Sequence, residues 1–241
     1  MECIKDIGGI EFFVKDNGNG SIILFESGYG NDSNVWNSIY EQVSLFSRAI
    51  AYDRAGLGKS SQTKSRRTID NQARELTELI ASMSLKEPIY IVAHSFGSHI
   101  ARLFAYLHPS MVKGLILIDP SHEEQEDKMK DFLPDREIME TWYEIEGSYD
   151  DCLLSDEIMK KVRFEGDNYS FPIYIFTAGI QPIKEVFPIW KQLHEDILTT
   201  TNGGKYHQVI EDSPHYIHLE QPEIIINVIK DIVQNKVLLK L

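Results

Sequence analysis

The chain has 241 residues, 42% of them hydrophobic and 25% charged, a composition ordinary for a soluble globular protein. The sequence contains no apolar run of the roughly 18 residues that a membrane-spanning helix needs. The formal net charge of −13 argues against nucleic acid or an anionic membrane as a partner, because both would repel the chain.

Apolar runs bounded by turn residues alternate with amphipathic stretches along most of the chain. We predict strands at 10–14, 21–25, 48–52, 88–92, 112–118, 172–176 and 206–210, and helices at 36–46, 68–83, 98–107 and 222–233. The Asn and Gly residues at 17–20 are predicted to form a hairpin turn between the first two strands. Pro222 suits the first turn of the last helix.

Several of these strands are apolar throughout, which is typical of a parallel sheet covered by helices on both faces. The opening hairpin would add antiparallel strands at one edge. We therefore predict a single α/β domain over residues 1–241, built as a three-layer sandwich around a mostly parallel sheet of about eight strands.

The strongest functional signal lies at the end of the predicted strand at 88–92. An apolar strand runs directly into AHSFG at 93–97, and a helix follows. In such a tight strand-to-helix turn, small residues two before and two after the serine avoid backbone clashes and leave its hydroxyl exposed. The adjacent helix N-terminus favours negative charge. Ser95 is therefore predicted to be a nucleophile.

This motif resembles the nucleophile elbow of the α/β-hydrolase superfamily, with Ala93 in place of the usual first glycine. Three further segments resemble the family's motifs in the family's order: ESGYG at 26–30, YDRAGLGKS at 52–60 and SPHYIHLEQPE at 213–223. The resemblance covers nearly the whole chain. It implies an α/β-hydrolase fold with a short helical lid and a Ser, acid, His triad.

The triad needs a base, because serine is a poor nucleophile until its proton is removed. We predict His215, which precedes the entry to the last helix; His218 is the alternative, and it is expected to pack or cap that helix instead. The backbone N–H groups of Tyr29 and Phe96 are expected to stabilise the oxyanion.

The acid departs from the commonest family pattern, because the loop AGIQP at 178–182 contains no carboxylate. The preceding predicted strand ends in Asp119, and some α/β-hydrolases resemble this by placing the acid one strand earlier. We therefore predict Asp119 as the acid that orients His215, with Glu123 as the next candidate.

No cofactor or metal ion is expected. Residues 28–33 imitate a dinucleotide fingerprint, but Ser33 stands in the place of its third glycine. Residues 58–60 imitate the end of a phosphate-binding loop, but Asp53 stands where that loop requires glycine. His215 and His218 have no third ligand at a recognisable metal-binding spacing.

Residues 121–170 interrupt the alternation and resemble a lid insertion. They carry 16 carboxylates against 6 basic residues. Ile138 and Trp142 lie at helical spacing there and are predicted to line the substrate pocket. The acidic side chains are expected to face water; if they reach the entrance, neutral or cationic esters would be preferred over anionic ones.

A serine at the elbow argues against dehalogenases and epoxide hydrolases of this fold, which use aspartate there. We predict hydrolysis of a small carboxylic ester or lactone through an acyl-enzyme, with thioesters and amides chemically compatible. The alternative is a receptor for a small molecule that keeps the triad but turns over little. Nothing in the residues indicates an oligomeric state.

The expected location is the cytoplasm. The first residues lack the cationic and apolar segments of a signal peptide. Cys3 and Cys152 have no metal or redox spacing and are expected to be free thiols.

Overall fold

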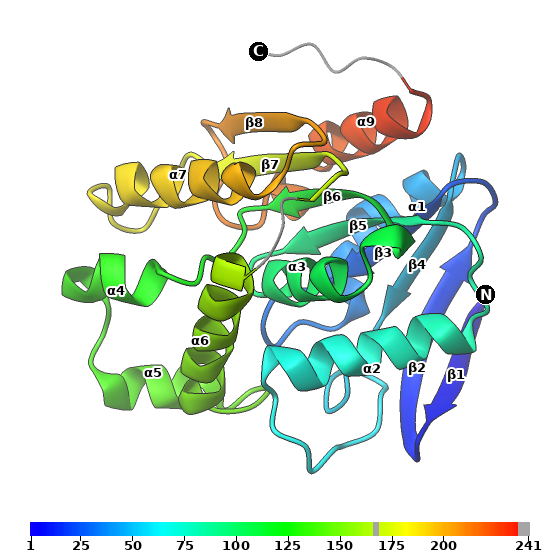
Figure 1. Cartoon of the computed structure of the whole chain (residues 1–241), viewed down its shortest axis with the longest axis horizontal. Coiled ribbons are helices and arrows are strands. Elements are labelled where there is room, and N and C mark those ends of the chain that lie inside the picture. Colours follow the sequence, from blue (N-terminus) through cyan, green and yellow to red (C-terminus); the bar gives the residue numbers. More distant parts are fainter. Residues whose placement is uncertain (166–168, 236–241) are drawn as a thin grey trace.

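A computed structural model describes residues 1–165 and 169–235. Its centre is one eight-stranded sheet in the order β1-β2-β4-β3-β5-β6-β7-β8, which agrees with the predicted strand number (Figure 1). The strands are β1 (Glu2–Ile7), β2 (Ile10–Asn17), β3 (Ile22–Glu26), β4 (Arg48–Tyr52), β5 (Ile89–His94), β6 (Val112–Ile118), β7 (Ile173–Ala178) and β8 (Lys205–Ile210).

The sheet is parallel from β4 to β8, and β1 and β2 add the antiparallel edge. The hairpin predicted at 17–20 is wrong, because β4 lies between β2 and β3. The hairpin instead joins β1 to β2 through Gly8 and Gly9, whose φ angles of 60° and 87° suit a tight two-residue turn. Every residue of β3 is buried, so this strand needs neighbours on both sides, whereas β1 alternates in exposure as an edge strand can.

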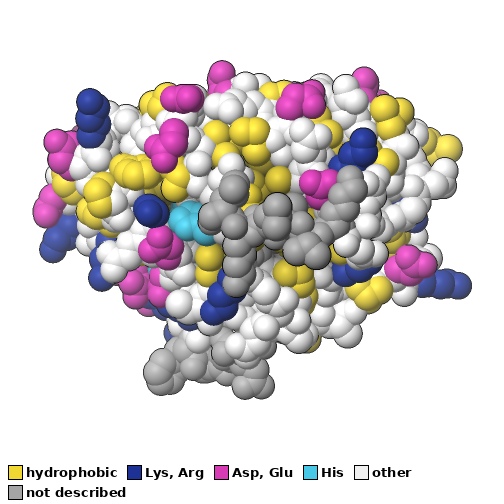
Figure 2. Space-filling view, turned by 90° about the horizontal axis from the view of Figure 1, so that it is seen from above, with side chains coloured by type: hydrophobic (Ala, Val, Ile, Leu, Met, Phe, Trp, Pro, Cys, Tyr) yellow, Lys and Arg dark blue, Asp and Glu magenta, His cyan; other side chains and the backbone are white. Residues whose placement is uncertain are grey.

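Helices cover both faces of the sheet, which confirms the three-layer architecture. Leu76 of α2 (Ile69–Ser82) and Ile100 of α3 (Gly97–Leu107) belong to the core on one face. Val43 of α1 (Asn37–Ser44) and Ile229 of α9 (Pro222–Val233) belong to the core on the other. The short helix α8 (Ile217–Glu220) precedes α9. Figure 2 shows acidic and basic side chains interspersed with apolar ones on the face formed by α7 (Val186–Ile197), β8 and α9.

The segment between β6 and β7 forms three helices, α4 (Gln125–Met129), α5 (Arg136–Tyr143) and α6 (Tyr149–Glu165), which we call the lid. Figure 1 shows them gathered at one end of the sheet, away from the β1–β2 hairpin, with α6 packed against α2 and α3. Helix α7, which the sequence patterns did not indicate, packs Trp190 and Leu193 against Met129 of α4. Within the described ranges, no helix is long and apolar enough to cross a membrane.

Candidate active site

Ser95 lies in a sharp turn between β5 and α3. Its φ of 49° falls in the left-handed region, which non-glycine residues rarely adopt and which stores strain. The turn is held by its backbone, because Ser95 N donates to Ile118 O at 3.1 Å and Ser95 O accepts from Ser121 N at 3.1 Å. A Cβ on Gly97 would lie 2.4 Å from Ser27 O, so only glycine fits there. Strand, strained serine and close-packed glycine together have the geometry that a nucleophile elbow requires.

His215 and Asp119 are brought together from positions 96 residues apart in the chain: His215 Nδ1 lies 2.6 Å from Asp119 Oδ2. The Asp119 side chain is 1% exposed and that of His215 is 41% exposed. A carboxylate only accepts hydrogen bonds, so His215 donates from Nδ1 and keeps Nε2 as an acceptor. This is the tautomer that a general base needs.

Asp119 is fixed by two further donors on its other oxygen. Oδ1 accepts from Ala178 N at 2.9 Å and from Trp190 Nε1 at 2.8 Å. Ala178 ends β7 and Trp190 belongs to α7, so the carboxylate extends from the end of β6 to the end of the neighbouring strand β7. A carboxylate in the loop after β7 is therefore not needed to hold His215.

The alternative acid, Glu123, has a different partner. Its oxygens accept from Arg102 at 2.8 and 3.0 Å, and both side chains are 1% exposed. Burial alone would raise the pKa of Glu123, but the ion pair with Arg102 outweighs burial and holds that pKa well below its usual range. Glu123 therefore belongs to a buried ion pair that lies under the lid.

The alternative base, His218, is completely buried. Its ring centroid lies 4.5 Å from that of Trp36, in a tilted arrangement, and 4.6 Å from that of His94, edge to face. Among the described residues neither ring nitrogen has a hydrogen-bond partner. Burial lowers the pKa of His218 to about 3, so the ring stays neutral and packs as an aromatic side chain.

His94 connects the serine loop to the histidine loop. Its Nε2 lies 3.1 Å from His215 O, and the two rings are 4.5 Å apart. In the part of the chain that the structure describes, no hydrogen bond joins Ser95 Oγ to the His215 ring. Such bonds are often long in ligand-free enzymes and shorten when substrate binds.

Two backbone N–H groups beside Ser95 are available to an oxyanion. Across residues 1–165 and 169–235, neither Tyr29 N nor Phe96 N donates to an acceptor. The two side chains meet edge to face with their ring centroids 5.1 Å apart, so their loops are held against each other. The prediction that these two N–H groups bind an oxyanion stays a prediction.

A buried arginine supports the Tyr29 loop. Arg54 follows β4 and donates to Ser27 O at 2.6 Å and to Gly28 O at 2.7 Å. It also pairs with Glu146, which follows α5 in the lid, through bonds of 2.6 and 2.7 Å. Glu146 in turn accepts from Gly30 N at 2.8 Å. Sequence reasoning recognised the loop that contains Arg54 but missed Glu146, because nothing marks it among the many acidic residues of 121–170.

A cavity of about 170 Å³ opens beside Ser95 under the lid. The two lid residues predicted to line it, Ile138 and Trp142, are 46% and 60% exposed and lie elsewhere, so that prediction is wrong. Helix α5 instead directs the next pair of residues at helical spacing inward: Met139 is buried and Tyr143 lines the cavity. Helical spacing groups Ile138 with Trp142 and Met139 with Tyr143, but it does not show which pair faces the core. The cavity is lined by Tyr29, Ser95, Phe96, His99, Ser121, Gln125, Glu126, Met129, Tyr143, Cys152, Asp156 and Trp190.

The described residues contain no group of three or more His, Cys, Asp or Glu side chains placed to hold a metal ion. Both cysteines are free thiols, as expected. Burial raises the pKa of the Cys152 thiol well above its usual range, so this lining residue is not a second nucleophile at neutral pH.

Comparison with known proteins gives a consistent picture. A family model described as the alpha/beta hydrolase fold matches residues 21–170. The uncharacterized protein YqjL of Bacillus subtilis is 29% identical over 242 residues, covering 96% of this chain and 92% of YqjL. A non-heme haloperoxidase of Rhodococcus erythropolis is 31% identical over 119 residues, 49% of this chain and 43% of that protein. A thermophilic esterase from Thermogutta terrifontis superimposes with a TM-score of 0.73 at 20% identity and 98% coverage of both chains.

Proposed function

Because the chain belongs to the α/β-hydrolase fold family, we propose that it is a serine hydrolase that cleaves a small carboxylic ester or lactone through an acyl-enzyme. The observation that carries this proposal is the 2.6 Å contact of His215 Nδ1 with the buried Asp119, next to a serine held at a φ of 49°. An orienting carboxylate has little purpose beside a half-exposed histidine unless that histidine moves a proton.

The proposed mechanism follows from these positions. Ser95 Oγ attacks the carbonyl carbon while His215 Nε2 takes its proton, and the N–H groups of Tyr29 and Phe96 stabilise the oxyanion. His215 then protonates the leaving alkoxide, which departs and leaves the acyl group on Ser95. Water attacks this ester with His215 again as the base, which releases the acid and restores the serine.

The comparisons support the fold and the reaction class more than the substrate. The esterase likeness, at 20% identity, is a likeness of fold. Support for an ester or lactone comes from the site itself, because a serine, a base and two free N–H donors suit acyl transfer to water. The cavity beside Ser95 is small, which favours a short acyl or alcohol group.

The test is labelling with a fluorophosphonate probe together with turnover of short-chain p-nitrophenyl esters and lactones. Ser95→Ala, Asp119→Asn and His215→Ala are compared with His218→Gln, a matched change at the neighbouring packing histidine. We expect labelling and turnover to vanish in Ser95→Ala, to fall at least 10³-fold in His215→Ala and to persist in His218→Gln.

Other results would decide against the proposal. Labelling of Ser95 without repeated turnover would favour the receptor over the enzyme. Equal labelling of Ser95→Ala and the wild-type protein would exclude Ser95 as the nucleophile.

A further inference from the structure

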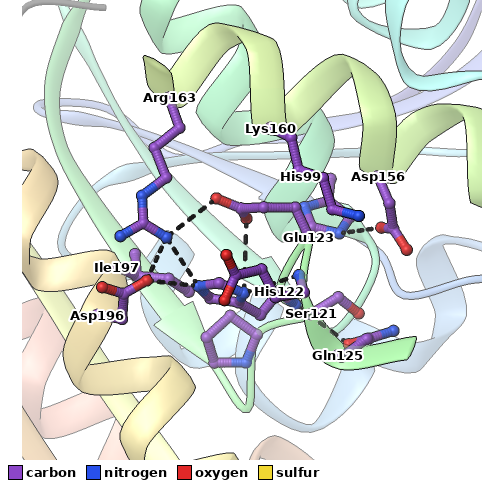
Figure 3. A network of polar contacts seen from close by, with 12 residues as sticks. His99, Ser121, His122, Glu123, Gln125, Asp156, Lys160, Arg163, Asp196 and Ile197 are labelled. Carbon is purple, nitrogen blue, oxygen red and sulfur yellow. Dashed lines mark hydrogen bonds and ion pairs between the residues drawn. The ribbon is translucent and has the colours of Figure 1, made fainter. Parts of the chain in front are cut away.

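One wall of the cavity beside Ser95 is polar and built from three helices. His99 of α3 lies one helical turn after Ser95, Glu126 comes from α4 and Asp156 from α6. Figure 3 shows Asp156 beside His99, and His99 Nε2 is 3.2 Å from Asp156 Oδ1. The nucleophile and two carboxylates therefore share one enclosed space.

Nearby cations are committed elsewhere. Arg102 pairs with Glu123. Arg163 pairs with Asp196 and lies 3.5 Å from Glu123 (Figure 3). Lys160 binds two exposed carboxylates of the lid, at 2.9 Å each. The residues that line the cavity, all in the described part of the chain, include no lysine or arginine.

The two cavity carboxylates differ from Glu123 and Glu146 of the same lid segment. Arginine partners hold the pKa values of Glu123 and Glu146 below their usual range in spite of burial. Burial raises the pKa of Asp156 and that of Glu126. The contact of Asp156 with His99 and the hydrogen bond from the Tyr149 hydroxyl to Glu126 each offset only part of the effect of burial.

His99 is the independent sign that something is missing from this wall. Its side chain is 1% exposed and lines the cavity, yet neither of its ring nitrogens has a hydrogen-bond partner among the described residues. Nε2 lies 3.2 Å from Asp156 Oδ1 without a hydrogen bond between them, and a neutral imidazole keeps one of its two nitrogens as an acceptor. A buried acceptor without a donor costs free energy, and a ligand with N–H groups would relieve that cost.

We propose that His99, Glu126 and Asp156 bind a protonated amine of the substrate, so that the ester or lactone cleaved at Ser95 carries an ammonium group. This inference rests on the proposed function. A primary ammonium is a compact cation with three donors, which matches one imidazole nitrogen and two carboxylates. The wall would repel a carboxylate or a phosphate at the same place.

The cavity volume limits the size of the group that carries the amine. A cavity of about 150 Å³ in another protein holds benzene, so the 170 Å³ here fits about six non-hydrogen atoms. A straight chain of five methylene groups that ends in an amine has that size. The amine can belong to the acyl side or to the alcohol side of the ester, and these two sources need separate substrates.

The experiment compares substrates of equal length and different charge. On the acyl side the p-nitrophenyl esters of 6-aminohexanoate, heptanoate and adipate are used; on the alcohol side, 5-aminopentyl acetate and hexyl acetate. We expect kcat/KM for the cationic ester to exceed that for its neutral match at least tenfold on one side, with the adipate ester slowest.

Isosteric variants assign the preference to the wall. Asp156→Asn and Glu126→Gln should each lower the cationic-to-neutral ratio of kcat/KM about 10- to 100-fold. The adjacent carboxylates Asp127 and Glu157 are 75% and 59% exposed, so Asp127→Asn and Glu157→Gln are matched controls that should leave the ratio within threefold of wild type.

A binding measurement separates failure of this inference from failure of the proposed function. Calorimetry with Ser95→Ala should show hexylammonium binding at least tenfold more tightly than hexanol, and Asp156→Asn in that background should remove the difference. Ser95-dependent hydrolysis that favours neutral or anionic esters would overturn the amine site and leave the esterase intact. Preferential binding of hexylammonium without ester turnover would support the amine site and count against the proposed reaction.

Discussion

Replacing Asp119 by asparagine changes one atom of the side chain and tests the proposed triad directly. Asp119 Oδ1 accepts from Ala178 N and Trp190 Nε1, two donors that cannot become acceptors. In the variant, the amide oxygen must take this position. The amide NH₂ then faces His215 Nδ1, where the wild-type carboxylate accepts at 2.6 Å. The imidazole must switch to the tautomer with its proton on Nε2, and it can no longer accept the proton of Ser95.

The expected loss in kcat is about 10⁴-fold, which corresponds to about 5.4 kcal/mol of activation free energy. KM should change little, because Asp119 is behind the histidine and does not contact the substrate. The assay is steady-state hydrolysis of a short p-nitrophenyl ester at pH 7, with urea unfolding to show that the variant is folded. Glu123→Gln is the control: it weakens a buried ion pair with Arg102 and lowers stability without touching His215. A folded Asp119→Asn protein that keeps more than a tenth of the wild-type kcat would refute the reasoning.

Three further predictions concern the lid, the acid limit of stability and the elbow. Glu146→Gln should lower the free energy of unfolding by about 3 kcal/mol and kcat about tenfold, since Gly30 N beside the oxyanion loop loses a charged acceptor. The control Glu144→Gln, at an exposed residue, should change neither quantity. Equal unfolding midpoints of Glu146→Gln and the wild-type protein would contradict the ion-pair argument. Burial lowers the pKa of His218 from 6.5 to about 3 in the folded protein, so the stabilisation is complete above pH 6.5 and is lost as the pH falls toward 3. His218→Leu should therefore reduce the slope of unfolding free energy against pH by up to about 1.4 kcal/mol per pH unit between pH 6 and 4, as measured by urea unfolding. An unchanged slope would show that His218 is protonated in the folded protein. Gly97→Ala should lower the free energy of unfolding by about 2 kcal/mol or more and slow fluorophosphonate labelling, because its Cβ would lie 2.4 Å from Ser27 O. Wild-type stability and labelling in this variant would mean that the Ser27 loop can move to accommodate a Cβ.

The sequence predicted those features that depend on residues adjacent in the chain. Ser95 and its flanking Ala93 and Gly97 are a local pattern, because a tight turn after a strand restricts the size of its neighbours. The apolar strands, and thus the three-layer fold, follow from the same kind of local signal. Asp119 was predicted through the family resemblance: the loop after β7, where the family usually carries the acid, has no carboxylate, and some α/β-hydrolases place the acid at the end of the preceding strand.

Other features depend on contacts between distant segments and were missed or wrong. Strand β4 lies between β2 and β3, and the apolar pattern of a strand does not indicate which other strands it pairs with. The side of α5 that faces inward is set by its contacts with α6 and the Tyr29 loop. Helical spacing alone therefore could not decide between the pair Ile138 and Trp142 and the pair Met139 and Tyr143. The partner of Glu146 is Arg54, 92 residues earlier, and no local pattern connects them.

The carboxylates of residues 121–170 have different roles, which depend on where each lies in the structure. Glu123 and Glu146 pair with the buried Arg102 and Arg54, so their charges hold the lid segment to α3 and to the loop of Tyr29. Exposed residues such as Asp127 and Glu157 share a lysine at the surface, where pairs contribute little. Only Glu126 and Asp156 combine a place in the cavity wall with the absence of a cationic partner among its lining residues. A substrate that brings its own positive charge would complete the same pairing that the arginines provide elsewhere, and it would do so next to Ser95.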